Sequence, residues 1–112
     1  MVVAEQNILI VHIQYRLGPF GFWYDGDHPN LAIKDQQVAL EWIQQQVQYF
    51  GGDPDNVTIS GSSAGGQSVQ LHLVTKSEKK LFHRAIVWSA PGIPSRDSNH
   101  TYVSLLKSNI YY

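Results

Sequence analysis

The sequence contains no cysteine and a single methionine among its 112 residues. Without cysteine the chain has no internal disulfide and no thiol nucleophile. Charged residues are also scarce, at 15% of the chain, and the formal net charge is −1. Because lysine and arginine form no long run, nucleic acid and anionic membrane surfaces are not expected as partners.

Long apolar segments are missing as well. No stretch reaches the roughly 18 apolar residues of a membrane-spanning helix, and Met1–Ala4 lacks the basic start and apolar continuation of a signal peptide. The compartment therefore stays open at this stage. Histidine, aspartate and glutamate show no metal-ligand spacing such as H-E-x-x-H, so we expect no metal site.

The chain does have enough apolar residues for a packed core, at 43% of the total. Its first part predicts a strand followed by a loop. Ile8–Tyr15 is rich in β-branched and apolar residues and ends before a Gly-Pro pair, which is typical of a buried parallel strand. Leu17–Asn30, with its glycines and prolines, predicts a surface loop.

A helix is predicted after this loop, with Asp35 as its N-cap and with Gly51 and Gly52 at its end. Its glutamines fall on one face, and apolar residues at spacings of three and four fall on the other. The residues predicted to form the apolar face are Ala39, Trp42, Ile43, Val47 and Phe50.

The second half predicts two further strands with a helix between them: Val57–Ser60, Ala64–Thr75 and Arg84–Ser89. Short apolar strands alternating with helices are typical of an α/β fold, with a parallel sheet covered on both faces. Thr101–Ile110 is compatible with another short helix. We expect residues 1–112 to form part of one α/β domain, with no second domain.

The second predicted strand runs directly into Gly61-Ser62-Ser63-Ala64-Gly65, a G-x-S-x-G pattern. In the strand-to-helix turn called a nucleophile elbow, the central serine has strained backbone angles that expose its hydroxyl. Ser63 is therefore the predicted nucleophile, and the N–H of Ala64 at the helix start is a predicted oxyanion donor. Gly61 and Gly65 are predicted to be required because a side chain at either position would collide with the neighbouring strand or helix.

The run from Phe50 to Gly65 resembles the active-serine signature of type-B carboxylesterases and cholinesterases. Other segments resemble the same family in order and spacing: Tyr15–Phe22, Lys34–Gln36, Ala39–Trp42 and Leu81–Ile86. The resemblance spans about residues 7 to 95. Two positions depart from the family pattern: Ser62 stands where glutamate is usual, and Trp88-Ser89-Ala90 stands where the strand tends to end in glycine.

The resemblance implies an α/β-hydrolase fold and a serine carboxylic-ester hydrolase that acts through an acyl-enzyme on Ser63. It implies no cofactor and a small-molecule ester as substrate, and it favours a secreted or extracellular location. Because such relatives are several times longer, we expect this chain to be an internal fragment. A non-catalytic cholinesterase-like adhesion or binding protein, or a lipase, amidase or thioesterase on the same fold, are the alternatives.

A serine nucleophile needs a histidine to take its proton and a carboxylate to orient that histidine. The family places both far downstream, so we expect them beyond this chain. His72 is interpreted as a packed helix residue, His83 as part of a turn, and Asp97 and His100 as too close in sequence to supply both groups. No glycine-rich oxyanion loop precedes Ile8. The fragment by itself is therefore expected to be inactive.

Two spatial relations also follow from the resemblance. Arg16 at a strand end and Asp35 at a helix start are expected to form an ion pair. The strands at Ile8–Tyr15 and Val57–Ser60 are expected not to be neighbours, because in α/β-hydrolases the strand leading to the oxyanion loop lies between them. The gap would be about two strand spacings, roughly 9 to 10 Å.

Overall fold

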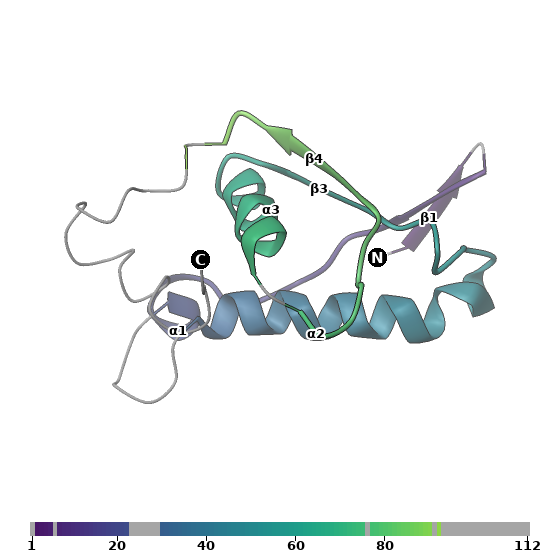
Figure 1. The fold of residues 1–112 in the computed structure, drawn as a ribbon, viewed down its shortest axis with the longest axis horizontal. Helices are drawn as coiled ribbons and strands as arrows, with labels where there is room; N and C mark the ends of the chain where they lie inside the picture. The colour runs from purple at the N-terminus through teal and green to yellow at the C-terminus, as the bar shows by residue number, and fades with distance from the viewer. Residues whose placement is uncertain (1, 6, 23–29, 76, 91, 93–112) are drawn as a thin grey trace.

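A computed structural model of the chain describes residues 2–5, 7–22, 30–75, 77–90 and 92. Two pairs of short strands and the helix α3 lie along one long helix, α2 (Figure 1). In chain order the elements are β1 (Val2–Glu5), β2 (Ile8–Val11), α1 (Gly18–Phe22), α2 (Leu31–Gln46), the 3-10 turn η1 (Val47–Phe50), β3 (Thr58–Ser62), α3 (Ala64–Val74) and β4 (Arg84–Trp88).

Strands β3 and β4 form a parallel pair, in register from Thr58 opposite Arg84 to Ser62 opposite Trp88. The helix α3 makes the crossover between them and packs against both strands. Parallel neighbours need such a crossover, because a tight turn can only return the chain antiparallel. The parallel arrangement predicted from the alternation of strands and helices is confirmed for these two strands.

The strand β2 differs from its prediction in length, partner and burial. It ends at Val11 rather than Tyr15, and it pairs antiparallel with β1, from Val2 opposite Val11 to Glu5 opposite Ile8. Its residues Ile8 and Ile10 are 62% and 47% exposed, so the prediction of a buried parallel strand is wrong. A partner three residues away in sequence loses little chain entropy on pairing, and no parallel neighbour of β2 is present among the described residues.

The pairs β1–β2 and β3–β4 belong to separate sheets in the described part of the chain. This confirms that β2 and β3 are not hydrogen-bonded neighbours. The width of the space between them stays a prediction.

The predicted surface loop at Leu17–Asn30 contains a short helix, α1, and residues 23–29 lie outside the described part. The predicted helix at Thr101–Ile110 also lies outside it. Gly21 of α1 lies so close to Arg16 that a Cβ there would be 2.4 Å from the Arg16 carbonyl oxygen. A Cβ on Gly21 would also lie 2.9 Å from the Cβ of Ala32, so α1 packs closely on the start of α2.

The helix α2 begins at Leu31, four residues before Asp35, and its N-cap is Asn30 with φ 59°. The prediction of Asp35 as N-cap is therefore wrong. Its carboxylate binds Arg16 instead of the N–H groups that start the helix. The predicted end is confirmed: η1 closes the helix, and Gly51 takes the left-handed conformation at φ 82°.

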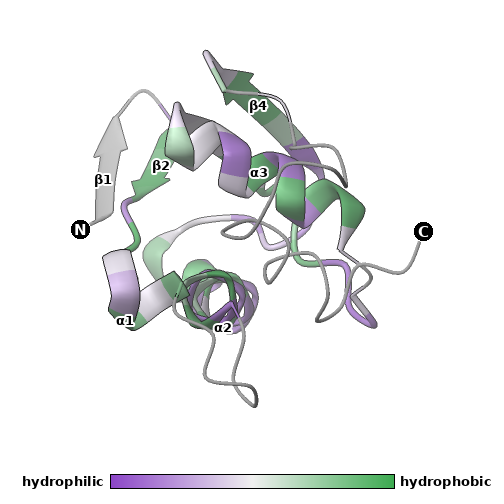
Figure 2. Ribbon diagram, turned by 90° about the vertical axis from the view of Figure 1, so that its left-hand side faces the viewer, coloured by the Kyte–Doolittle hydropathy of each residue, from purple (hydrophilic) through white to green (hydrophobic). Residues whose placement is uncertain are grey.

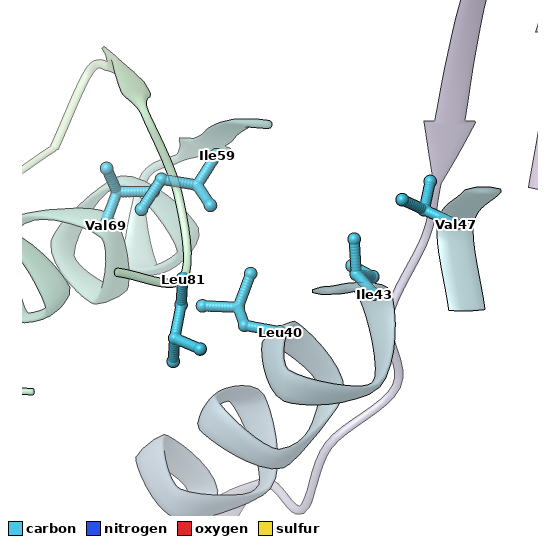
Figure 3. Packing of buried hydrophobic residues seen from close by; sticks show 6 residues of the cluster. All are labelled: Leu40, Ile43, Val47, Ile59, Val69 and Leu81. Carbon is cyan, nitrogen blue, oxygen red and sulfur yellow. The ribbon is translucent and has the colours of Figure 1, made fainter. Parts of the chain in front are cut away.

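The hydrophobic core lies between α2, α3 and the strands β3 and β4. Figure 3 shows side chains from α2, η1, β3, α3 and the segment before β4 pointing towards one another. The six buried residues of this cluster are Leu40, Ile43, Val47, Ile59, Val69 and Leu81.

The apolar face of α2 was predicted only in part. Ile43 and Val47 are buried as expected, whereas Trp42 and Phe50 are 44% and 50% exposed and contact each other with ring centroids 5.9 Å apart. The stripe that faces the core also includes Gln36, a polar residue that is 3% exposed. The periodicity of apolar residues favoured the stripe with Trp42, because the neighbouring stripe, which is the buried one, includes the polar Gln36.

Both described long helices lie on the same face of β3. Ile59 of β3 packs in the core cluster with residues of α2 and α3, while Thr58 and Ser60 on the alternate side are exposed. The expected covering of both faces is therefore not seen in the described residues, and the hydrophobic strand β4 (Figure 2) leaves Ile86 and Trp88 exposed. Among the described helices, none is both long and apolar enough to cross a membrane.

Candidate active site

Ser63 stands between the end of β3 and the start of α3, and its side chain is exposed. Its backbone angles, φ 52° and ψ −119°, are rare for a residue with a side chain and cost on the order of 1–3 kcal/mol. Two hydrogen bonds hold this conformation. The Ser63 N–H donates to the Trp88 carbonyl oxygen at 3.0 Å, and the Ser63 carbonyl accepts the Gln67 N–H at 2.9 Å.

Two glycines of the turn have no room for a side chain, and only one of them, Gly61, was among the two predicted. A Cβ on Gly61 would lie 2.3 Å from the carbonyl carbon and oxygen of Gly65, which confirms the predicted collision. A Cβ on Gly65 would meet no described atom within 4 Å, so the collision predicted there is absent. The second close approach is at Gly66, where a Cβ would lie 2.9 Å from the Cβ of Ala90. Gly65 contributes the backbone that a side chain on Gly61 would strike.

Ala64 is the first residue of α3. The N–H groups in the first turn of a helix have no partner within the helix, and the role of the Ala64 N–H as an oxyanion donor stays a prediction. The carbonyl oxygen of Ala64 accepts a hydrogen bond from the Ser68 hydroxyl at 3.1 Å.

The histidines nearest in sequence to Ser63 have partners elsewhere. The ring Nε2 of His72 lies 2.9 Å from the amide oxygen of Gln36, and Nδ1 of His83 accepts the N–H of Val57 at 3.4 Å. Because an amide oxygen can only accept, neutral His72 carries its proton on Nε2. Burial lowers the pKa of His72, which favours this neutral form. The interpretation of His72 as a packed helix residue is confirmed.

The other histidines and Asp97 lie apart from Ser63 in the sequence or outside the described residues. His12 is exposed just past the end of β2, and His28, Asp97 and His100 are outside the described residues. Within the described ranges, no group of three or more histidine, aspartate or glutamate side chains is placed to hold a metal ion.

The buried amide of Gln36 joins α2 to α3. The prediction that the glutamines of this helix share the face opposite the apolar one is therefore wrong for Gln36, which is 3% exposed. Its Nε2 donates to the Ser68 hydroxyl at 3.2 Å, and its Oε1 accepts from His72. The available signal was its phase on the helix, four residues after Ala32 and four before Leu40, both of which are buried. A glutamine in phase with core residues needs partners, because a buried amide without them is costly.

The predicted ion pair of Arg16 and Asp35 is confirmed. The guanidinium Nη2 lies 2.6 Å from Oδ1 and Nε lies 2.7 Å from Oδ2, while the Arg16 backbone N–H also donates to Oδ2 at 3.1 Å. The side-chain hydrogen bonds from Arg16 lower the pKa of Asp35 to about 2. Because Arg16 follows β2 and Asp35 lies in α2, this partly exposed pair links the segment after β2 to α2 at the residue before Gln36.

A parallel strand pair, helices packed on it and a strained serine at the strand-to-helix turn place the chain among α/β proteins. The chain belongs to the Carboxylesterase family, whose sequence pattern matches residues 1–102. Membership of this family implies the α/β-hydrolase fold.

The chain is also similar to curated proteins of several animals. Acetylcholinesterase 4 of Caenorhabditis briggsae is 47% identical over 92 residues, which cover 79% of this chain and 15% of that protein. Liver carboxylesterase 1 of Oryctolagus cuniculus is 51% identical over 86 residues, which cover 74% of this chain and 15% of that protein. Pyrethroid hydrolase Ces2e of Rattus norvegicus is 45% identical over 107 residues, which cover 92% of this chain and 19% of that protein. The chain spans less than a fifth of the length of these relatives.

Proposed function

We propose that the protein containing this chain is a serine carboxylic-ester hydrolase with Ser63 as its nucleophile. The observation that carries the proposal is the backbone of Ser63 at the strand-to-helix turn, with φ 52° in a residue that is not glycine. Strain of this kind persists only where surrounding contacts maintain it, and it is concentrated at functional sites. In a nucleophile elbow it exposes the hydroxyl above the sheet.

In the proposed reaction the Ser63 oxygen attacks the ester carbonyl carbon, and the hydroxyl proton passes to a histidine. The Ala64 N–H stabilises the negative charge that develops on the carbonyl oxygen. The bond to the alcohol then breaks, the alcohol leaves with the proton, and an acyl-enzyme remains on Ser63. Water hydrolyses this intermediate and releases the acid. No step needs a cofactor.

We place the histidine and the carboxylate of this reaction outside the described residues. The rings of His72 and His83 are already bonded to Gln36 and to the backbone of Val57. A base for Ser63 has to come within about 3 Å of its hydroxyl. As the resemblance implies, we infer that both missing groups, and the glycine-rich oxyanion loop, belong to segments beyond this chain.

The proposed substrate class is a small-molecule carboxylic ester. Similar proteins carry names such as "Liver carboxylesterase" and "Cholinesterase 1", and others are named for acylcarnitine or pyrethroid hydrolysis. This variety in substrates within one family supports the reaction type and leaves the ester itself to be found by assay.

The test is fluorophosphonate labelling of the full-length protein, together with hydrolysis of a nitrophenyl ester. Wild type should be labelled and should hydrolyse the ester, and Ser63→Ala should lose both activities. Ser62→Ala is the matched control, because Ser62 is an exposed serine one residue away on β3. Label retained in Ser63→Ala, or a folded wild type that neither labels nor hydrolyses, would overturn the proposal and favour a non-catalytic binding protein.

A further inference from the structure

A chain of side-chain hydrogen bonds leads from the interior of α2 to the residue that follows Ser63. Nε2 of Gln36 donates to the Ser68 hydroxyl, and that hydroxyl donates to the carbonyl oxygen of Ala64. The distances are 3.2 Å and 3.1 Å. The chain thus ends on the first residue of α3, at the turn that holds Ser63.

Gln36 contacts α3 at two places one helical turn apart. Its nitrogen binds Ser68, and its oxygen binds His72. Residues four apart lie on the same face of a helix, so the two bonds restrict both rotation of α3 about its axis and sliding along it. At 3% exposure, the amide has little access to water as an alternative partner.

The residue before Gln36 contacts a third part of the molecule. Asp35 uses both carboxylate oxygens on Arg16, which joins α2 to the segment after β2. Gln36 therefore lies where α2, α3 and the segment after β2 come together. A shift of α3 relative to α2 has to break the bonds to Ser68 and His72.

A small movement of α3 matters because its first turn carries the proposed chemistry. Ser63 and Ala64 have to present the hydroxyl and an N–H to the same carbonyl group, and an error of about 1 Å in such an arrangement can reduce the rate on the order of 100-fold. The Ser68 hydroxyl donates its hydrogen bond to the carbonyl oxygen of Ala64, which belongs to the same residue as the proposed oxyanion N–H.

We propose that Gln36 is a positioning residue for Ser63 and Ala64, acting through Ser68. This inference rests on the proposed serine-hydrolase function and adds a residue from another helix to it. Gln36 touches neither the ester nor the reacting atoms in this arrangement. Its effect is on the placement of the α3 first turn, and so on the rate of acylation rather than on substrate affinity.

The test compares Gln36→Leu with Gln44→Leu in the full-length enzyme. Gln44 is a glutamine on the same helix whose Nε2 also makes two hydrogen bonds, to the carbonyl oxygens of Pro54 and Leu81. Neither partner belongs to α3. Gln36→Leu should lower kcat and the rate of fluorophosphonate labelling about tenfold, with KM within about twofold of wild type. Gln44→Leu should lower the melting temperature while leaving kcat unchanged.

A second variant, Ser68→Ala, removes the middle of the chain and leaves the contact of Gln36 with His72 in place. It should lower kcat to a similar extent as Gln36→Leu. Because both substitutions interrupt one path, the double variant should be no slower than the slower single variant. If Gln36→Leu does not fold, Ser68→Ala decides the question alone, since it removes a single oxygen from a partly exposed residue.

The outcomes separate this inference from the function on which it rests. A wild-type enzyme that labels normally, with Gln36→Leu and Ser68→Ala that label equally fast, overturns the positioning role and leaves the hydrolase in place. An effect confined to melting temperature, as in Gln44→Leu, does the same. A folded wild type that neither labels nor hydrolyses overturns both proposals together.

Discussion

Two serines with a positive φ lie next to each other at the ends of the parallel strands. Ser63 follows β3 with φ 52°, and Ser89 follows β4 with φ 44°. The N–H of Ser63 donates to the carbonyl of Trp88, the residue before Ser89, so a hydrogen bond joins the two strand ends beside both strained residues. Strain at adjacent strand ends requires tight surroundings, and here the backbone of Gly61, Gly65 and Gly66 supplies them.

The glycines of this turn should therefore differ in their tolerance of substitution. In the full-length protein Gly61→Ala should lower the free energy of unfolding by on the order of 3 kcal/mol or more, because its Cβ would strike backbone atoms that cannot rotate away. Gly65→Ala should lower the free energy of unfolding markedly less, because a Cβ there meets no described atom within 4 Å. Denaturant unfolding of the two variants beside wild type measures this difference. Equal losses would contradict it.

At the scale of elements, the contact between α2 and α3 combines apolar packing with one polar network. Leu40 and Ile43 of α2 pack with Val69 of α3, and the Gln36 amide binds His72 in the same interface. A histidine in such a place is stabilised as the neutral ring, because burial disfavours its charged form. The interface is thereby sensitive to protonation.

Stability should consequently depend on pH through His72. Its pKa is lowered in the folded chain from the ordinary value of 6.5, so below about pH 6.5 the unfolded chain binds more protons than the folded one. The contribution is complete above that pH and declines as the pH falls from 6.5 towards the lowered folded pKa. Melting temperatures between pH 7.5 and 5.5 should fall for wild type and fall less for His72→Gln, which removes the titrating ring. An unchanged slope in His72→Gln would exclude this histidine as the cause.

At the scale of the whole molecule, the described residues leave one face of the strands without cover. Ile8 and Ile10 of β2 and Ile86 and Trp88 of β4 are all at least 45% exposed. The strands also belong to two separate sheets among the described residues. The backbone N–H and C=O groups of β2 and β3 therefore form no hydrogen bonds between these two strands. Exposed apolar strand surface of this kind promotes association between chains.

The chain expressed alone, as residues 1–112, is expected to aggregate and to show no esterase turnover above background. It has the proposed nucleophile, but the rings of His72 and His83 are bonded elsewhere, and removing one oxyanion donor in related chemistry already costs about 3 kcal/mol. Size-exclusion chromatography and nitrophenyl ester hydrolysis measure the two properties. Steady hydrolysis by a monomeric chain, abolished by Ser63→Ala, would contradict the expectation.

Local sequence predicted the strand, turn and helix around Ser63, because glycine spacing and β-branched runs act through nearby backbone geometry. The pairing of β3 with β4 followed from the intervening helix, since a crossover of that length permits parallel strands. Arg16 and Asp35 were predicted to pair from the family resemblance, and their separation of 19 residues would have hidden the contact from any local pattern.

Other features were decided only by tertiary structure. Which stripe of α2 is buried depended on the partner helix, so Gln36 became a core residue and Trp42 an exposed one. The close approach at Gly66 rather than Gly65 depended on where Ala90 lies after β4. The antiparallel pairing of β2 with β1 likewise depended on which strands lie beside β2 in the described part of the chain. Glycine spacing and local residue type predicted the serine turn, whereas burial and contact depend on surfaces that meet only once distant segments are packed.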